Sequence, residues 1–179
     1  KLYMAVSDPG HVDPLRYARG FGGAKAQETL ARRLAEDLAT EVGRIRPEVY
    51  VISALQLSTL PNAGELRRLK QLLAPLSTDV EVVMHVEDPA RMLVRHYESA
   101  ILDGRRADLS QELALIGTEG WRSAALADWN RIAPPLNDFP EVQGVPHWLD
   151  LAALVAHWEG VVGAGSVRLR PDDEVLFAS

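Results

Sequence analysis

Residues able to do chemistry gather at two places in this sequence. Arg91 and Arg95 follow the pair Asp88-Pro89 and stand four residues apart, so both side chains project from one face if the segment is helical. Two guanidinium groups at that spacing can bind a phosphate or another oxyanion. His11 lies in a turn-rich segment near the start, and imidazole is the side chain that most often serves as a general base. The sequence therefore offers a pair of neighbouring cations and one candidate base, and the simpler interpretation of His11 is a surface or locally bonded histidine.

Other chemistries lack their sequence patterns. The chain has no cysteine, which excludes disulfides, thiol catalysis and thiolate metal sites. The five histidines show no His-x-x-x-His or His-Glu pairing, so we expect no metal. A Gly-x-Ser-x-Gly elbow of serine hydrolases is also missing. His85 is interpreted as a buried core residue and His96 as the better functional candidate, with packing the simpler interpretation of both.

Length and composition set outer limits. A chain of 179 residues with 47% hydrophobic residues predicts one globular α/β domain over residues 1–179. A net charge of −6 argues against nucleic acid as a partner, because such binding needs a basic face. No apolar run is long enough for a membrane span, and the lack of cysteine fits a cytoplasmic location. Because the sequence opens on Lys1, we expect it to be a fragment of a longer chain.

A strand followed directly by a helix must position the two arginines. Residues 80–86 form a β-branched apolar run typical of a strand buried on both faces of a parallel sheet. Asp88 is predicted to cap the following helix, with Pro89 at its first position. The helix should pack through Met92, Leu93, Ala100 and Ile101 and end at Asp103-Gly104. Such corners lie at the carboxyl end of a strand, where α/β sheets bind ligands and where helix N-termini attract anions.

The rest of the chain alternates helix and strand signals. We predict helices over residues 24–45, 61–73 and 147–162, and a helix over 108–129 that is interrupted at Gly117 and Gly120. Strands are expected at residues 1–6, 49–54 and 167–171, and a loop, acting as a lid over a site, at 132–146. The strand at 49–54, the next helix and the strand at 80–86 form a βαβ unit, so these strands should pair in parallel.

This strand-to-helix corner resembles that of sulfotransferases that use 3′-phosphoadenosine 5′-phosphosulfate (PAPS). In that family a strand is followed by Arg-Asp-Pro and then Ser-x-Tyr; this chain has Glu87-Asp88-Pro89 and Arg95-His96-Tyr97. Bacterial relatives close with a helix of the type Leu-x-x-Leu-x-x-Trp, a Gly turn and a strand ending in Arg-Pro. Here these parts are Leu151, Leu154, Trp158, Gly163 and Arg170-Pro171. The resemblance covers roughly residues 48–171.

The resemblance implies a fold and an activity. It implies a three-layer P-loop type α/β fold, with a central parallel sheet flanked by helices. It also implies transfer of a sulfuryl group from PAPS to a hydroxyl or amine of a carbohydrate or small metabolite, with Arg91 and Arg95 as anion contacts and His11 as the base. Ser53 stands in the family's Ser-Ser-Glu-like run and is the further nucleotide contact that the resemblance implies.

Three departures leave alternatives open. Glu87 replaces the family's phosphate-binding Arg, and a carboxylate there repels phosphate, although Arg95 returns a positive charge. Leu55 replaces the Glu of the Ser-Ser-Glu-like run, and the N-terminal phosphate loop with Lys and Thr does not follow residues 1–6. A non-catalytic binding or assembly domain of the same fold is therefore the main alternative. A nucleotide kinase relative ranks lower, because it needs the same loop.

Overall fold

A computed structural model describes residues 1–20, 23–127, 129 and 138–171. The chain divides into two compact units, Lys1–Val80 and Glu81–Ser179. The expectation of a single domain over residues 1–179 stays a prediction. Helices dominate the described residues, and the two strands among them form one small parallel sheet, so the predicted α/β class is confirmed in this coarse form. No three-layer sandwich is evident among these residues.

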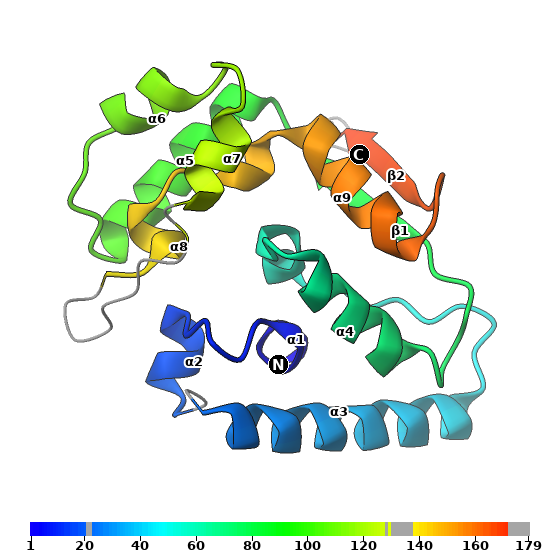
Figure 1. The fold of residues 1–179 in the computed structure, drawn as a ribbon. Coiled ribbons are helices and arrows are strands. Elements are labelled where there is room, and N and C mark those ends of the chain that lie inside the picture. The colour runs from blue at the N-terminus through cyan, green and yellow to red at the C-terminus, as the bar shows by residue number, and fades with distance from the viewer. Residues whose placement is uncertain (21–22, 128, 130–137, 172–179) are drawn as a thin grey trace, which may run out of the picture. The chain divides into compact units, whose positions relative to one another are not determined.

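The first unit is helical throughout its regular elements (Figure 1). These are α1 (Leu2–Val6), α2 (Pro14–Ala18), α3 (Ala24–Ile45), the 3₁₀ turn η1 (Leu55–Thr59) and α4 (Ala63–Leu73). The predicted helix at 24–45 is confirmed as α3, whose charged residues face solvent. The predicted helix at 61–73 is α4, and it begins with a capping box in which the Glu65 carboxylate accepts the Asn62 backbone N–H at 3.0 Å.

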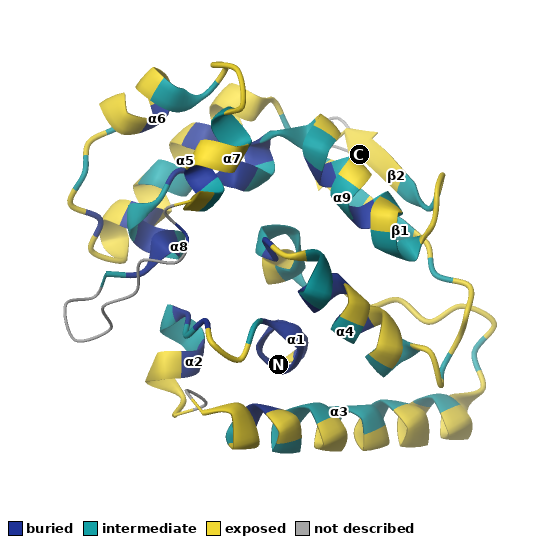
Figure 2. Ribbon diagram, viewed as in Figure 1, coloured by how far each residue is buried: buried dark blue, intermediate teal, exposed yellow. Residues whose placement is uncertain are grey.

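Residues 1–6 form a helix rather than the predicted strand. All five residues of α1 are buried, and the helix packs against α3 and α4 (Figure 2). A short apolar run cannot distinguish a buried helix from a buried strand, because neither shows a solvent-facing period. Packing against α3 and α4 therefore determines the conformation of α1.

Residues 49–54 also differ from the predicted strand. They have no regular secondary structure and pair with no strand among the described residues. Val49 and Val51 are 77% and 82% exposed, while the Tyr50 hydroxyl donates to the Glu41 carboxylate of α3 at 3.0 Å. The β-branched composition favoured a buried sheet strand, and that prediction is wrong: these residues form no strand and most of them are exposed. The predicted βαβ unit is therefore not formed by the described residues.

The second unit contains the sheet and six helical segments among its described residues. Its elements are β1 (Val82–Val86), α5 (Pro89–Leu102), α6 (Ser110–Leu115), α7 (Trp121–Ala127), α8 (Pro140–Gln143), the 3₁₀ turn η4 (His147–Leu149), α9 (Leu151–Val162) and β2 (Val167–Pro171). The predicted interruption of the 108–129 helix occurs between α6 and α7, with Gly117 and Gly120 at positive φ. Part of the predicted lid, residues 132–137, lies outside the described residues; α8 lies in its remainder.

The two strands confirm the predicted positions of β1 and β2 but not the expected burial of β1. They pair in parallel, with Val82 opposite Val167 and Val86 opposite Pro171. Burial alternates along β1, and His85 is exposed instead of buried in a core. A strand buried on both faces was therefore the wrong interpretation. The alternation is that of a sheet with one packed face, and α9 packs against β2.

Candidate functional site

The corner between β1 and α5 is built as the sequence predicted. Asp88 accepts hydrogen bonds from the backbone N–H groups of Ala90 and Arg91 at 2.9 and 3.1 Å, and Pro89 takes the first helical position. This side-chain cap holds the start of a 14-residue helix at the carboxyl end of β1. Two of the N–H groups that an anion could have used are consequently occupied by Asp88.

Arg91 and Arg95 lie together and share one carboxylate. The Arg91 Nη1 atom is 3.7 Å from Glu87 Oε1, and the Arg95 Nη1 atom is 2.8 Å from Glu87 Oε2. The arginine side chains are 60% and 66% exposed, whereas Glu87 is only 16% exposed. The two cations thus project into solvent on one side of α5 and bracket a carboxylate that is largely shielded from water.

The neighbouring strand adds further charges to the same unit. Arg170 of β2 is the register partner of His85, and both are exposed. Arg168 is the register partner of Val83, and its Nε atom forms an ion pair with Glu81 at 2.7 Å, which raises the pKa of Arg168. The side of the sheet that carries these residues is therefore rich in arginine, and part of its charge is offset by carboxylates.

His11 lies in the first unit, in a loop that buried side chains hold in place. Its backbone N–H donates to the Asp8 carbonyl at 3.0 Å, and its carbonyl accepts a hydrogen bond from the Arg16 guanidinium. Arg16 is fully buried and also donates to the Asp8 carbonyl at 2.7 Å. The histidine is itself buried. The backbone that carries the candidate base is therefore fixed before any substrate binds.

Glu65 of α4 also holds the loop that carries His11, through the backbone of Asp8. Its Oε1 atom accepts the Asp8 backbone N–H at 2.6 Å, and the residue is 1% exposed. Burial raises the pKa of the Glu65 carboxyl, although the N–H groups of Asn62 and Asp8 and the positive charges of Arg68 and His11 act in the opposite direction. A carboxyl held out of water beside a histidine is an arrangement used in general acid–base chemistry.

Ser53 is exposed in the irregular segment 49–54, which precedes η1. It belongs to the first unit, as His11 does, whereas Arg91 and Arg95 belong to the second. The structure thus brings the two arginines together around Glu87. The roles given to His11 and Ser53 stay predictions.

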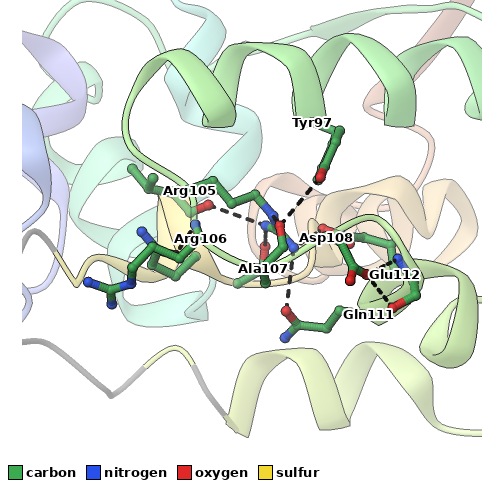
Figure 3. Close-up of polar contacts among 11 residues, drawn as sticks. Tyr97, Arg105, Arg106, Ala107, Asp108, Gln111 and Glu112 are labelled. Atoms are coloured by element: carbon green, nitrogen blue, oxygen red, sulfur yellow. Dashed lines mark hydrogen bonds and ion pairs between the residues drawn. The ribbon is translucent and has the colours of Figure 1, made fainter.

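The sequence interpretation missed an ion pair in the second unit between Arg105 and Glu112 (Figure 3). The Arg105 Nη2 atom lies 2.5 Å from Glu112 Oε1, and both side chains are fully buried. Arg105 also donates to the carbonyls of Ala107, Val142 and Gly144 at 3.2, 3.2 and 3.0 Å. Burial raises the pKa of Glu112, and the Arg105 charge opposes that effect. Arg105 therefore ties the loop after α5 to α6 through Glu112 and to α8 through the Val142 carbonyl.

His96 lies on α5 next to Arg95, and its side chain packs against Trp148. Its ring meets Trp148 edge to face at a centroid distance of 5.4 Å. Burial, helped by the positive charge of Arg105, lowers the pKa of His96 to about 4. The ring is therefore neutral at physiological pH. This packing is what the simpler interpretation of His96 predicted.

Two further features are absent among the described residues. Among residues 1–20, 23–127, 129 and 138–171, no group of three or more His, Cys, Asp and Glu side chains is placed to bind a metal ion. None of the helices in the same part of the chain is long and apolar enough to cross a membrane.

Comparisons of the chain with models of known protein families, with curated proteins and with solved structures found no match.

Proposed function

We propose that this chain is a sulfotransferase-like domain that binds the phosphorylated end of PAPS at the corner between β1 and α5. The observation that carries the proposal is the placement of Arg91 and Arg95, one turn apart and both exposed, beside the carboxyl end of a parallel strand. That position suits ligand binding in α/β sheets. The parallel pairing of β1 with the strand that ends in Arg170-Pro171 supports the same proposal. The proposal also includes the three-layer fold of that family, a central parallel sheet flanked by helices.

The proposed reaction moves one sulfuryl group. A hydroxyl or amine of a carbohydrate or small metabolite attacks the sulfur of PAPS, and its proton passes to a base. The bond between sulfur and the 5′-phosphate oxygen breaks, which leaves adenosine 3′,5′-bisphosphate. Arg91 and Arg95 hold the 3′-phosphate by charge-assisted hydrogen bonds. The roles of Ser53 as a further contact and of His11 as the candidate base come from the sequence alone, since both residues belong to the first unit.

Binding of adenosine 3′,5′-bisphosphate tests the nucleotide part of the proposal. The four tryptophans, Trp121, Trp129, Trp148 and Trp158, all belong to the second unit, so their fluorescence follows the melting of the unit that carries the arginines. A ligand at 100 times its Kd adds about 2.7 kcal/mol to the stability of the protein that binds it. We expect the tryptophan melting temperature to rise with added bisphosphate.

Arg95→Ala is the matching variant. A hydrogen bond between charged groups contributes about 1.5–3 kcal/mol, so we expect calorimetric affinity for the bisphosphate to fall about 10- to 100-fold. Arg32→Ala is the control, because Arg32 is 68% exposed and pairs with Glu36 on α3 as Arg91 pairs with Glu87. An equal affinity in the Arg95→Ala variant and the wild type removes Arg95 from the site.

Transfer of labelled sulfuryl from PAPS to a panel of hydroxyl and amine acceptors tests the catalytic part. His11→Gln should lower kcat and leave the bisphosphate affinity unchanged. If wild type and variant transfer equally well, His11 is not the base.

A second candidate function rests on Glu87. Its carboxylate already pairs with both arginines, which favours a non-catalytic binding or assembly domain that retains the corner. For that candidate we expect no change of the tryptophan melting temperature with bisphosphate and no sulfuryl transfer to any acceptor.

A further inference from the structure

Glu87 pairs with the same two arginines that the proposed site offers to a bound anion. Its two carboxylate oxygens face different arginines, at 3.7 Å from Arg91 and 2.8 Å from Arg95. The carboxylate therefore bridges the pair instead of pairing with one member. Because Asp88 already accepts the N–H groups of Ala90 and Arg91, the start of α5 offers an incoming anion few other donors.

The charges at this corner cancel. Glu87 and Asp88 contribute −2, and Arg91 and Arg95 contribute +2, so their sum is zero. A phosphate that binds the arginines must draw them away from Glu87 or bind beside its negative charge. Glu87 is 16% exposed, so water replaces the lost arginine contacts only in part. Both routes weaken the binding of any anion.

We propose that Glu87 is an internal competitor of the nucleotide, a carboxylate that sets the affinity of the corner for phosphate at a low value. This inference rests on the proposed nucleotide site and adds how that site is regulated. While Glu87 pairs with the arginines, bound nucleotide dissociates readily. The affinity of the site for nucleotide rises when the carboxylate is removed or pairs with another cation. The effect grows with ligand charge, because the repulsion by Glu87 is proportional to it.

Replacement of Glu87 tests the proposal. Glu87→Gln keeps the size of the side chain and raises the charge sum of the corner from zero to +1. We expect its calorimetric affinity for adenosine 3′,5′-bisphosphate to exceed that of the wild type about tenfold, with a smaller gain for the monoanionic adenosine 3′,5′-cyclic monophosphate. Glu87→Asp keeps the charge on a shorter side chain and should give an intermediate affinity. Glu36→Gln is the control, since Glu36 pairs with Arg32 on α3 and should leave the affinity unchanged.

The outcomes separate this inference from the proposed function. If the wild type binds bisphosphate and Glu87→Gln binds it no better, the inference is overturned and the nucleotide site stands. If only Glu87→Gln binds, the inference is supported and nucleotide binding by the wild type is overturned. If neither protein binds, both are overturned. If the wild type binds the bisphosphate and Glu87→Gln binds it about tenfold more tightly, both the inference and the proposed function are supported.

Discussion

Breaking the buried pair between Arg105 and Glu112 should destabilise the second unit strongly. Removing one partner of a buried ion pair costs about 3–5 kcal/mol, because the other charge stays buried without compensation. After Glu112→Ala, Arg105 still donates to the carbonyls of Ala107, Val142 and Gly144. We therefore expect a loss near the lower end, about 3 kcal/mol. Glu112→Gln keeps a neutral acceptor and should lose about half as much, since charged hydrogen bonds are roughly twice as strong as neutral ones.

Urea unfolding followed by tryptophan fluorescence measures this loss, because all four tryptophans belong to the second unit. With a slope of about 1.5 kcal/mol per molar urea, a loss of about 3 kcal/mol lowers the midpoint by about 2 M. Arg106→Ala is the control: Arg106 is the next residue, its side chain is 61% exposed, and its contact with Asp138 is 3.6 Å. An exposed pair of this kind contributes about 1 kcal/mol or less.

A double-mutant cycle gives the decisive result. Arg105→Met combined with Glu112→Leu replaces the pair by apolar side chains and should be more stable than the sum of the two single losses predicts. Additive losses, or a midpoint of Glu112→Ala equal to that of Arg106→Ala, would refute the reasoning. Either result means that the two charges do not stabilise each other in the folded unit.

Two further predictions concern pH. Because the folded state lowers the pKa of His96 from 6.5 to about 4, the unfolded chain binds the proton more readily, and stability should fall as pH drops from 6.5 to 4, by up to about 3 kcal/mol. His96→Gln should reduce this loss in tryptophan-monitored urea unfolding. Burial raises the pKa of Glu65, so the folded state binds that proton more readily and the contribution of Glu65 to stability should fall as pH rises above about 4.5. In urea unfolding followed by far-UV circular dichroism, Glu65→Gln should lack this part of the pH dependence; an unchanged slope contradicts the assignment.

The sequence predicted those elements whose signals are local. The apolar period of α3, the cap formed by Asp88 and the proline at the start of α5 are all properties of neighbouring residues. The positions of β1 and β2 followed in the same way from short β-branched or alternating runs. Arg91 and Arg95 were also found to be neighbours from their spacing alone, because i and i+4 positions meet on a helix.

The remaining features depend on partners far away in the sequence. Residues 1–6 and 49–54 are apolar runs. Their conformation depends on the elements that pack or pair with them, and the composition of the runs does not identify those elements. Arg105 lies three residues after the end of α5, a place where a cation is usually solvated; its carbonyl partners Val142 and Gly144 lie 37 and 39 residues further on. Glu87 was read as a charge that repels phosphate, and its pairing with both arginines became visible only in the structure.

The way in which α1 is held has a consequence for the order of folding. Side chains of Gln27 and Arg68 donate to the carbonyls of Met4, Ser7 and Val6, so the end of this short helix is satisfied by groups 20 to 62 residues later in the chain. Closing such long loops costs entropy before any contact repays it. The native contacts of α1 therefore depend on residues of α3 and α4, and we expect α1 to be among the later elements of this unit to fold, which pulsed hydrogen exchange would test.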